Sequence, residues 1–485
     1  MAHIEFIDQT LRDGHQSLWG MRMQAGQVLP VAREIDRTGF RVVDVTGSSM
    51  FEVLVRYCRE DPWAGLDLIS KALPRSRLRA GSRSNAIVGF SLNPNSLLEL
   101  WIRTLAKHGI GSFWIYDCLF NIDQMRWMCG IVHDAGAEVV PSVMYGLSPV
   151  HTDEFFADKV GQMATFEGVS AIYVEDAPGV LTPERSRTLW PALVEAAGDV
   201  PLELHCHNTT GLAPINYLIG IEAGADIIHT ASLPLANGPS LPSTEAMLEN
   251  VQRRGHTTSL DESLLPVVAG HFRHVAEREG YLIGVPNEYQ VFTYDHQLPG
   301  GMTGTLKNQL AQYGMTHRLE EVLEECAVVR QELGYPVSAT PFSQLIGIQS
   351  VLNVVTGNRY SIVPDEVIVY ALGHLGPFAA PLDEDVKDRI LSSQRGKEFA
   401  HWEPPQPSRK ELRHEYGENL SDEELLLHAL IPTEDIKAMK AAGPPRTDYP
   451  RFETSAATFL HDLISRTTAR HLHVERPEFS LTLRR

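Results

Sequence analysis

The sequence predicts an α/β fold: a TIM (β/α)8 barrel followed by a mostly helical C-terminal domain. Short apolar segments alternate with amphipathic helical patterns through the first half of the chain. Glycines such as Gly39, Gly109, Gly136 and Gly224 close helical patterns just before the next apolar segment, as is typical of loops between a helix and a strand. Beyond Leu260 the strand signals fade and longer helical patterns follow. Together these observations favour one barrel and a second, helical domain.

The strand count is what identifies the barrel. Eight strand–helix units within roughly 250 residues are the size of a TIM barrel. A doubly wound sheet is the alternative, but no glycine-rich phosphate loop follows the first expected strand. The expected strands begin near Glu5, Arg41, Leu78, Ser112, Glu138, Ala171, Leu202 and Asp226.

The predicted domains are a catalytic barrel over residues 1–290 and a helical domain over residues 291–485. Within the second domain, helices are expected over residues 318–333 and 343–356, and the Pro-rich residues 402–407 read as a linker. Residues 297–302 read as a loop that enters or borders the barrel mouth.

Composition narrows the class of partner. The 485 residues are 43% apolar and 21% charged, with a net charge of −19, which is typical of a globular protein. This acidity argues against nucleic acid or an anionic membrane as a main partner, but not against a small anionic substrate. No signal peptide or membrane span is expected. Five scattered cysteines without a C-x-x-C pair favour free thiols in a cytoplasmic protein.

Polar residues gather at the carboxyl ends of the expected strands. In a TIM barrel these ends meet at the active face. One acidic residue at a strand end is often only a helix N-cap, but so many in corresponding positions indicate an enzyme. The residues are Asp8, Asp44, Arg83, Asp117, Tyr145, Glu175, His205 and His207.

His205 and His207 indicate a metal site. Residues i and i+2 of a strand point to the same face, so the two imidazoles lie together. Alone, this spacing is a weak signal and is also met in unrelated polar residues near a loop. Asp8 is expected to be the third ligand, and Glu175, its neighbour Asp176, or water the fourth. Such a donor set suits zinc, manganese, cobalt or iron.

Other polar residues define the expected chemistry. A divalent ion would polarise a carbonyl group and stabilise an enolate. Arg12 and Arg83 are candidates for binding a carboxylate, and Gln16 for a further hydrogen bond. Asp117 is a catalytic candidate, and Tyr145 either donates to an oxyanion or is a half-buried aromatic residue. This set suits a 2-oxo acid that reacts at C3.

Residues 8–17, Asp-Gln-Thr-Leu-Arg-Asp-Gly-His-Gln-Ser, resemble the opening motif of the carboxyltransferase domains of biotin-dependent enzymes. That family comprises pyruvate carboxylase, the oxaloacetate decarboxylase alpha subunit and the pyruvate-binding subunit of transcarboxylase. The resemblance covers nearly the whole chain and is greatest to the transcarboxylase subunit. Further similar motifs, in family order, lie at residues 61–63, 148–152, 205–211, 299–302, 340–344 and 429–432.

The resemblance implies carboxyl transfer between carboxybiotin and pyruvate or a related 2-oxo acid through an enolate. It implies a homodimer, metal ligands at Asp8, His205 and His207, and pyruvate contacts at Gln16 and Arg83. Biotin would arrive on a separate carrier protein charged by a biotin carboxylase subunit. Residues 438–441, Ala-Met-Lys-Ala, lie in a helical pattern and are not expected to carry biotin.

Three positions depart from the family pattern. The family's carboxylated lysine is replaced by Glu175, which keeps the charge and two oxygens on a shorter side chain. The Arg-Gly-x-Asn loop reads Arg-Ser-Asn-Ala from Arg83, and Ser240 stands near the position of a biotin-binding threonine. The alternatives are therefore a biotin-independent decarboxylase or aldolase-type lyase, and a non-catalytic scaffold. Biotin dependence would distinguish the carboxyltransferase from the lyase. Metal content would distinguish both of these enzymes from the scaffold.

Overall fold

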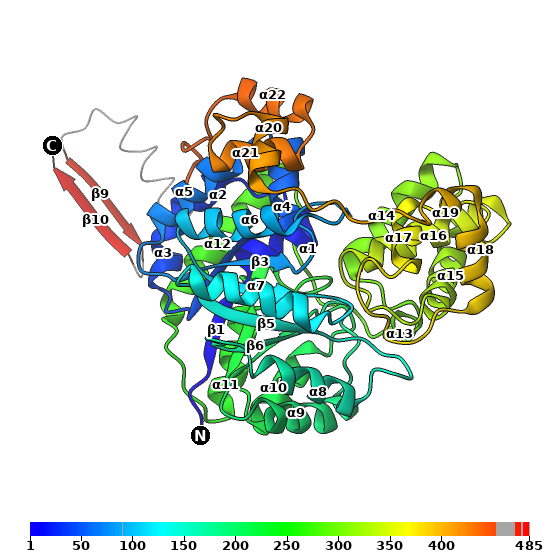
Figure 1. Ribbon diagram of the computed structural model, residues 1–485. Coiled ribbons are helices and arrows are strands. Elements are labelled where there is room, and N and C mark those ends of the chain that lie inside the picture. Colours follow the sequence, from blue (N-terminus) through cyan, green and yellow to red (C-terminus); the bar gives the residue numbers. More distant parts are fainter. Residues whose placement is uncertain (90, 453–470, 477–478, 485) are drawn as a thin grey trace. The chain divides into compact units, whose positions relative to one another are not determined.

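The computed structural model describes residues 1–89, 91–452, 471–476 and 479–484. Within them, eight parallel strands close into a barrel, each hydrogen-bonded to the next and the eighth to the first (Figure 1). Each strand falls on an expected segment, so the predicted TIM barrel is confirmed. The strands are β1 (Glu5–Asp8), β2 (Val42–Gly47), β3 (Leu78–Arg83), β4 (Ile110–Tyr116), β5 (Glu138–Met144), β6 (Ile172–Asp176), β7 (Leu202–Cys206) and β8 (Ile227–Thr230).

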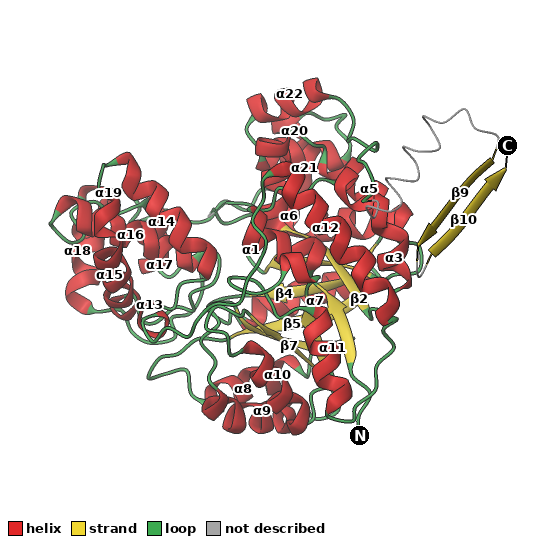
Figure 2. Ribbon diagram, turned by 180° about the vertical axis from the view of Figure 1, so that it is seen from behind, coloured by secondary structure: helices red, strands yellow, loops and turns green. Residues whose placement is uncertain are grey.

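Helices surround the strands on the outside of the barrel (Figure 2). Thr152, Thr182 and Ser243 begin three of them, because each hydroxyl accepts a backbone N–H of the first helical turn. The helices are α1 (His15–Trp19), α2 (Ala25–Val28), α3 (Ala32–Arg37), α4 (Ser48–Val53), α5 (Pro62–Ala72), α6 (Asn95–Lys107), α7 (Ile122–Asp134), α8 (Asp153–Met163), α9 (Pro183–Ala197), α10 (Ala213–Ala223), α11 (Thr244–Arg253) and α12 (Leu265–Glu279).

The second half of the described chain is helical up to residue 442, as predicted. Residues 300–302, expected as loop, instead begin a helix. After the Pro-rich residues 402–407 the chain returns to the barrel, where Asp435 pairs with Arg59 at 2.8 Å. The helices are α13 (Thr293–His296), α14 (Gly300–Gln312), α15 (Leu319–Glu332), α16 (Phe342–Thr356), α17 (Asp365–Ala371), α18 (Glu384–Ser392), α19 (Gln394–Glu398), α20 (Arg409–Tyr416), α21 (Asp422–Leu430) and α22 (Thr433–Ala442).

The last described residues form an antiparallel pair that the sequence reasoning missed, β9 (His471–Arg476) with β10 (Phe479–Arg484). The expected helical domain also extends over residues 453–470, which lie outside the described residues. Among the described helices, none is both long and apolar enough to cross a bilayer.

Strand alternation decides which side chains enter the barrel. Ile7, Val42, Trp114, Tyr173 and Ile227 form a small buried cluster separate from the main core. They come from five different strands, and the rings of Trp114 and Tyr173 stack 4.7 Å apart across the interior. Every second residue from these positions also faces inward. The interior set includes Asp44, Arg79, Ser112, Glu175, Glu203, His205 and His229.

An ion pair crosses the barrel interior. Arg79 on β3 donates to both carboxylate oxygens of Glu203 on β7, at 2.5 and 2.9 Å. Its Nε also donates to Ser112 at 3.0 Å. Both charged side chains are at most 1% exposed. Barrel interiors are more commonly filled by branched apolar residues. The Arg79–Glu203 pair therefore makes the interior beneath the barrel mouth charged rather than apolar.

Glu60 gives a pH-dependent prediction for the fold. The Glu60 carboxylate accepts the Ala25 backbone N–H at 3.0 Å and is 3% exposed. Burial raises its pKa from 4.5 to about 7. The folded state therefore holds a proton that the unfolded chain releases, and stability falls as pH rises from 4.5 to 7. A pKa difference of one unit corresponds to about 1.4 kcal/mol. Above pH 7, Glu60 therefore lowers the free energy of unfolding by roughly 3 kcal/mol relative to its value below pH 4.5.

Glu60→Gln should therefore become more stabilising relative to the unchanged protein as pH rises from 5 to 8. The measurement is the difference in melting temperature between the two proteins at each pH. The exposed Glu249→Gln is the control, and its difference should stay constant with pH. A Glu60→Gln difference that does not grow with pH would contradict the assignment.

Candidate active site

A cavity of about 260 Å³ opens at the carboxyl ends of the barrel strands. Asp13, Glu175 and His207 line it from the barrel. Gly300, at the start of α14, and Ser343, in α16, line it from the helical second half. The cavity therefore combines residues of both predicted domains, at the face where TIM-barrel active sites lie.

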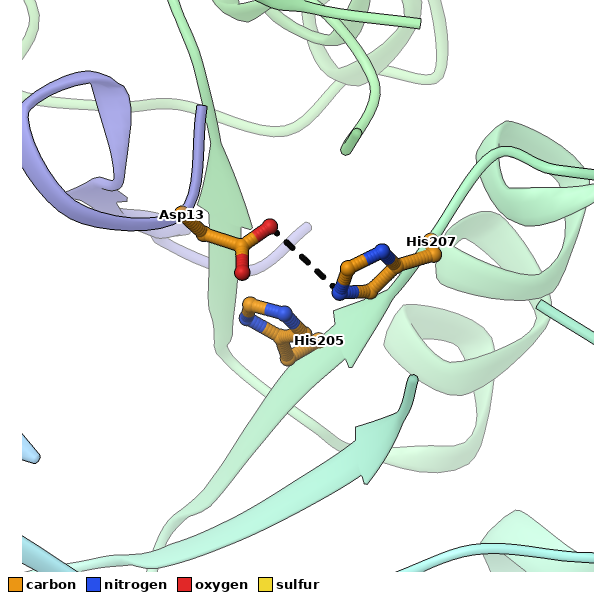
Figure 3. A group of neighbouring side chains, drawn as sticks. All are labelled: Asp13, His205 and His207. Carbon is orange, nitrogen blue, oxygen red and sulfur yellow. Dashed lines mark ion pairs between the residues drawn. The ribbon is translucent and has the colours of Figure 1, made fainter. Parts of the chain in front are cut away.

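Asp13, His205 and His207 meet at the carboxyl end of β7 (Figure 3), and two of them, Asp13 and His207, line this cavity. Each offers a ligand atom within 4.8 Å of the others, and all three residues are buried. His205 lies on β7 and His207 just beyond its end, as the i, i+2 spacing predicts. Asp13 comes from a π-helical turn, η1 (Thr10–Gly14), that carries its carboxylate to 3.4 Å from His207 Nε2.

The expectation that Asp8 joins the histidines is wrong. Ile7 faces the barrel interior, so strand alternation turns Asp8 outward. Its Oδ1 accepts from the Thr10 backbone N–H at 3.2 Å and from the Thr10 hydroxyl at 2.5 Å. Burial raises the pKa of Asp8 to about 7. Asp8 thus stabilises the turn that presents Asp13.

The Nε2 atoms of His205 and His207 are available to bind a cation. His207 Nδ1 lies 2.6 Å from the Pro239 carbonyl oxygen, which only accepts, so its proton is on Nδ1. The Nε2 atoms of His205 and His207 are buried and have no hydrogen-bond partner among the described residues. Burial lowers the pKa of His205, so its ring is neutral. Two imidazole nitrogens and a carboxylate oxygen fit a divalent metal ion of the zinc, manganese, cobalt or iron type.

Glu175 faces the same cavity, whereas its alternative Asp176 does not. Glu175 pairs in register with His205 and shares its inward direction, while Asp176 pairs with Cys206 and points outward. Asp176 accepts the backbone N–H groups of residues 179, 180 and 181 at 2.7–3.0 Å. Both oxygens of its carboxylate therefore bind the loop after β6. Glu175 keeps one buried oxygen without a partner among the described residues.

Arg12 organises the floor of the cavity. Its Nη1 donates to Asp13 at 3.0 Å, its Nη2 to the Tyr173 hydroxyl at 3.0 Å, and its Nε to Gln9 at 3.1 Å. Its guanidinium also lies over the Trp114 ring, 4.8 Å from the centroid. A guanidinium has five N–H donors, so N–H groups remain for an anion in the cavity. Gln16, the other expected substrate contact, also lines the cavity.

Besides Asp8 and His205, four expected site residues lie outside the cavity lining. Arg83 donates to the carbonyl oxygens of residues 87 and 89 and so supports its own loop. Asp117 accepts from Ser84 and from the Leu119 backbone N–H. Tyr145 follows the inward-facing Met144 and is turned outward beside Phe156. The Ser240 hydroxyl donates to the Leu235 carbonyl at 2.7 Å.

Sequence reasoning missed Asp13, although it stands within the motif at residues 8–17. One signal was available: if Ile7 belongs to the inner face, Asp8 cannot, and the next acidic residue is Asp13. The reasoning also missed Tyr173 and His229, which contact the His205 Nδ1 atom at 2.6 and 3.1 Å. Both residues occupy inward-facing positions of their strands, so strand alternation predicts that they lie in the barrel interior.

A closed parallel barrel with a polar cavity at its carboxyl-terminal mouth defines a TIM-barrel enzyme. Residues 121–269 match the family described as HMGL-like, and residues 293–470 match the one described as conserved carboxylase domain. The chain is 34% identical over 444 residues to a pyruvate carboxylase subunit of Methanocaldococcus jannaschii, covering 90% of this chain and 78% of that one. The chain therefore belongs to the carboxyltransferase family of biotin-dependent carboxylases.

Two further comparisons agree. The methylmalonyl-CoA carboxyltransferase 5S subunit of Propionibacterium freudenreichii subsp. shermanii is 30% identical, with 88% and 86% of the two chains covered. The expected greatest likeness to the transcarboxylase subunit is therefore wrong, because the Methanocaldococcus jannaschii protein is more similar. The carboxyltransferase domain of Rhizobium etli pyruvate carboxylase with pyruvate and biocytin shares the fold, with a TM-score of 0.83 at 23% identity over 99% of this chain and 83% of that one. The comparisons do not support the lyase alternative.

Proposed function

We propose that this chain transfers a carboxyl group between carboxybiotin, held by a separate carrier protein, and pyruvate or a related 2-oxo acid. The observation that carries the proposal is the cluster of Asp13, His205 and His207 beside a cavity that Asp13 and His207 line. The Nε2 atoms of both histidines lack a hydrogen-bond partner among the described residues. The names of the relatives support the substrate class, since one is a pyruvate carboxylase subunit.

Asp13, His205 and His207 would hold the divalent ion, with Glu175 as a further ligand. When bound, such an ion polarises a carbonyl group and stabilises an enolate. Arg12 orients the Asp13 carboxylate and keeps N–H groups free for the carboxylate of the substrate. Gln16 lines the same space and supplies a further hydrogen-bonding group.

Gly81 leaves room for the Trp114 ring, because a Cβ atom at position 81 would lie only 2.4 Å from that ring.

Glu175 lines the cavity but is not one of the three residues whose ligand atoms lie within 4.8 Å of one another. A lysine needs added carbon dioxide to become an anionic ligand, whereas a glutamate is a carboxylate as synthesised. Its inward position beside His205 places that carboxylate in the cavity. We propose that Glu175 replaces the family's carboxylated lysine as a ligand.

The test is loss of oxaloacetate catalysed by the full-length, metal-loaded chain, with and without free biotin. We expect biotin to stimulate the loss, because free biotin accepts the carboxyl group in place of the carrier. His207→Ala should abolish this activity, while the exposed His401→Ala should retain it. Loss that ignores biotin would contradict carboxyl transfer, and equal activity in His207→Ala would contradict the site.

The remaining assignments are part of the same proposal. The chain would act with a biotin carrier protein and a biotin carboxylase subunit, as a homodimer, which light scattering would measure. We divide it at residue 290 into barrel and helical domain, supported by the family match that begins at residue 293. All five cysteines are free thiols, which supports a cytoplasmic location.

A further inference from the structure

A third histidine, His229 on β8, lies in the barrel interior beneath the candidate metal site. Its side chain is completely buried. Its Nδ1 is 3.1 Å from Nδ1 of His205, and its Nε2 is 3.1 Å from Oε2 of Glu203. It lines no part of the cavity, so substrate binding does not account for it. These contacts with His205 and Glu203 instead connect the buried Arg79–Glu203 ion pair to a candidate metal ligand.

The partners of His229 determine where its proton lies. Glu203 is held as an anion by two hydrogen bonds from Arg79 and can only accept, so His229 Nε2 carries a proton. On the other side, Gln9 Nε2 lies 3.1 Å from His229 Nδ1. The Gln9 oxygen is occupied by the Nε–H of Arg12, which fixes the Gln9 amide with its nitrogen toward His229. His229 Nδ1 is therefore an acceptor, and its one lone pair is shared between Gln9 Nε2 and His205 Nδ1, each 3.1 Å away.

This lone pair decides the tautomer of His205. The two Nδ1 atoms are 3.1 Å apart, and two lone pairs facing each other at that distance in a buried site would repel. His205 must therefore carry its proton on Nδ1 and donate it to His229. Its own lone pair is then on Nε2, the atom without a hydrogen-bond partner among the described residues.

Tyr173 offers a competing arrangement. Its hydroxyl lies 2.6 Å from His205 Nδ1 and accepts a hydrogen bond from Arg12 Nη2 at 3.0 Å. If Tyr173 donated its own proton to His205 Nδ1, the His205 proton would move to Nε2 and block a metal ion. His229 opposes that arrangement, because the Nδ1 lone pairs of His205 and His229 would then face each other at 3.1 Å.

We propose that Arg79, Glu203 and His229 form a positioning relay that fixes the His205 tautomer and presents its Nε2 lone pair to the metal ion. The inference rests on the proposed function, because that proposal supplies the metal ion. His229 touches neither the cavity nor the other ligands of the site. It is a positioning residue that acts through His205, and outer partners of metal-bound histidines commonly have this role.

The experiment measures Zn²⁺ affinity of the full-length, metal-stripped chain by competition with a chelator. His229→Leu removes the acceptor and should raise the Zn²⁺ dissociation constant about 10- to 100-fold. His229→Asn places an amide oxygen where Nδ1 was and should stay within about threefold of the unchanged protein. Both variants lose the bond to Glu203, so a purely structural role for His229 would weaken Zn²⁺ binding equally in the two. The melting temperature of each metal-free variant shows that it is folded.

Tyr173→Phe, a milder change, tests the same relay from the other side. It removes the competing donor, so Zn²⁺ affinity should be retained, and the His229→Leu/Tyr173→Phe double variant should recover part of the lost affinity. The relay is overturned if folded His229→Leu binds Zn²⁺ like the unchanged protein. It is also overturned if Tyr173→Phe alone weakens binding about tenfold, because Tyr173 would then be the essential acceptor. Absence of Zn²⁺ and Co²⁺ binding by the unchanged chain would instead overturn the proposed metal site, and the relay with it.

Discussion

Asp13→Asn should raise the metal dissociation constant at least about 100-fold and remove biotin-stimulated loss of oxaloacetate. The substitution keeps the shape of the side chain and an oxygen that can accept from Arg12, so the fold should survive. It removes the negative charge that lies 3.4 Å from His207 Nε2. Loss of a direct ligand should exceed the 10- to 100-fold cost typical of outer partners. Metal content after dialysis and chelator competition measure the effect.

Asp8→Asn is the matched control for this prediction. It makes the same chemical change five positions earlier, on a side chain turned away from the cavity. Its amide oxygen can still accept both hydrogen bonds from Thr10. Metal affinity should therefore stay close to that of the unchanged protein. If Asp8→Asn lost the metal and Asp13→Asn kept it, the assignment of the carboxylate ligand would have to be reversed.

Arg79→Met should be the most destabilising single substitution in the barrel interior. It leaves the Glu203 carboxylate buried without its cation, and removal of one member of a buried ion pair typically costs about 3–5 kcal/mol. Arg79 and Glu203 are each at most 1% exposed and share two hydrogen bonds, so solvent cannot compensate for the loss. The shift of the urea unfolding curve measures the decrease.

Two variants control for this prediction. Arg79→Met/Glu203→Leu removes both charges and should recover most of the stability, because apolar residues of similar volume often replace a buried pair at little cost. Arg253→Met makes the same substitution in the exposed pair of Arg253 and Glu249 and should leave unfolding unchanged. A small effect of Arg79→Met, equal to that of Arg253→Met, would contradict a structural role for the interior ion pair.

The acidic net charge fits the local chemistry once the cavity is known. Most acidic side chains have no part in the site, while Arg12 and His207 line the cavity where an anionic substrate would bind. The overall charge argued only against nucleic acid and anionic membranes as partners. The site itself depends on a few side chains whose partners are fixed within the barrel.

Much of the architecture and half of the site could be predicted from the sequence. Strand positions follow from short apolar segments with glycine-containing loops, and these are local properties of the chain. The same holds for His205 and His207, because side chains two apart on a strand share a face whatever surrounds them. The inward direction of Glu175 follows from the same rule once strand β6 is placed.

Tertiary structure decided the rest. The turn at residues 10–14 brings Asp13 to the histidines, and no periodicity describes the path of such a turn. Arg83 bonds to the carbonyl groups of its own loop because that loop folds back on it. The relay through His229 joins strands far apart in sequence, and only closure of the barrel brings them together. Local sequence determines the direction of a side chain on its strand, whereas its partners depend on which distant residues the closed barrel places beside it.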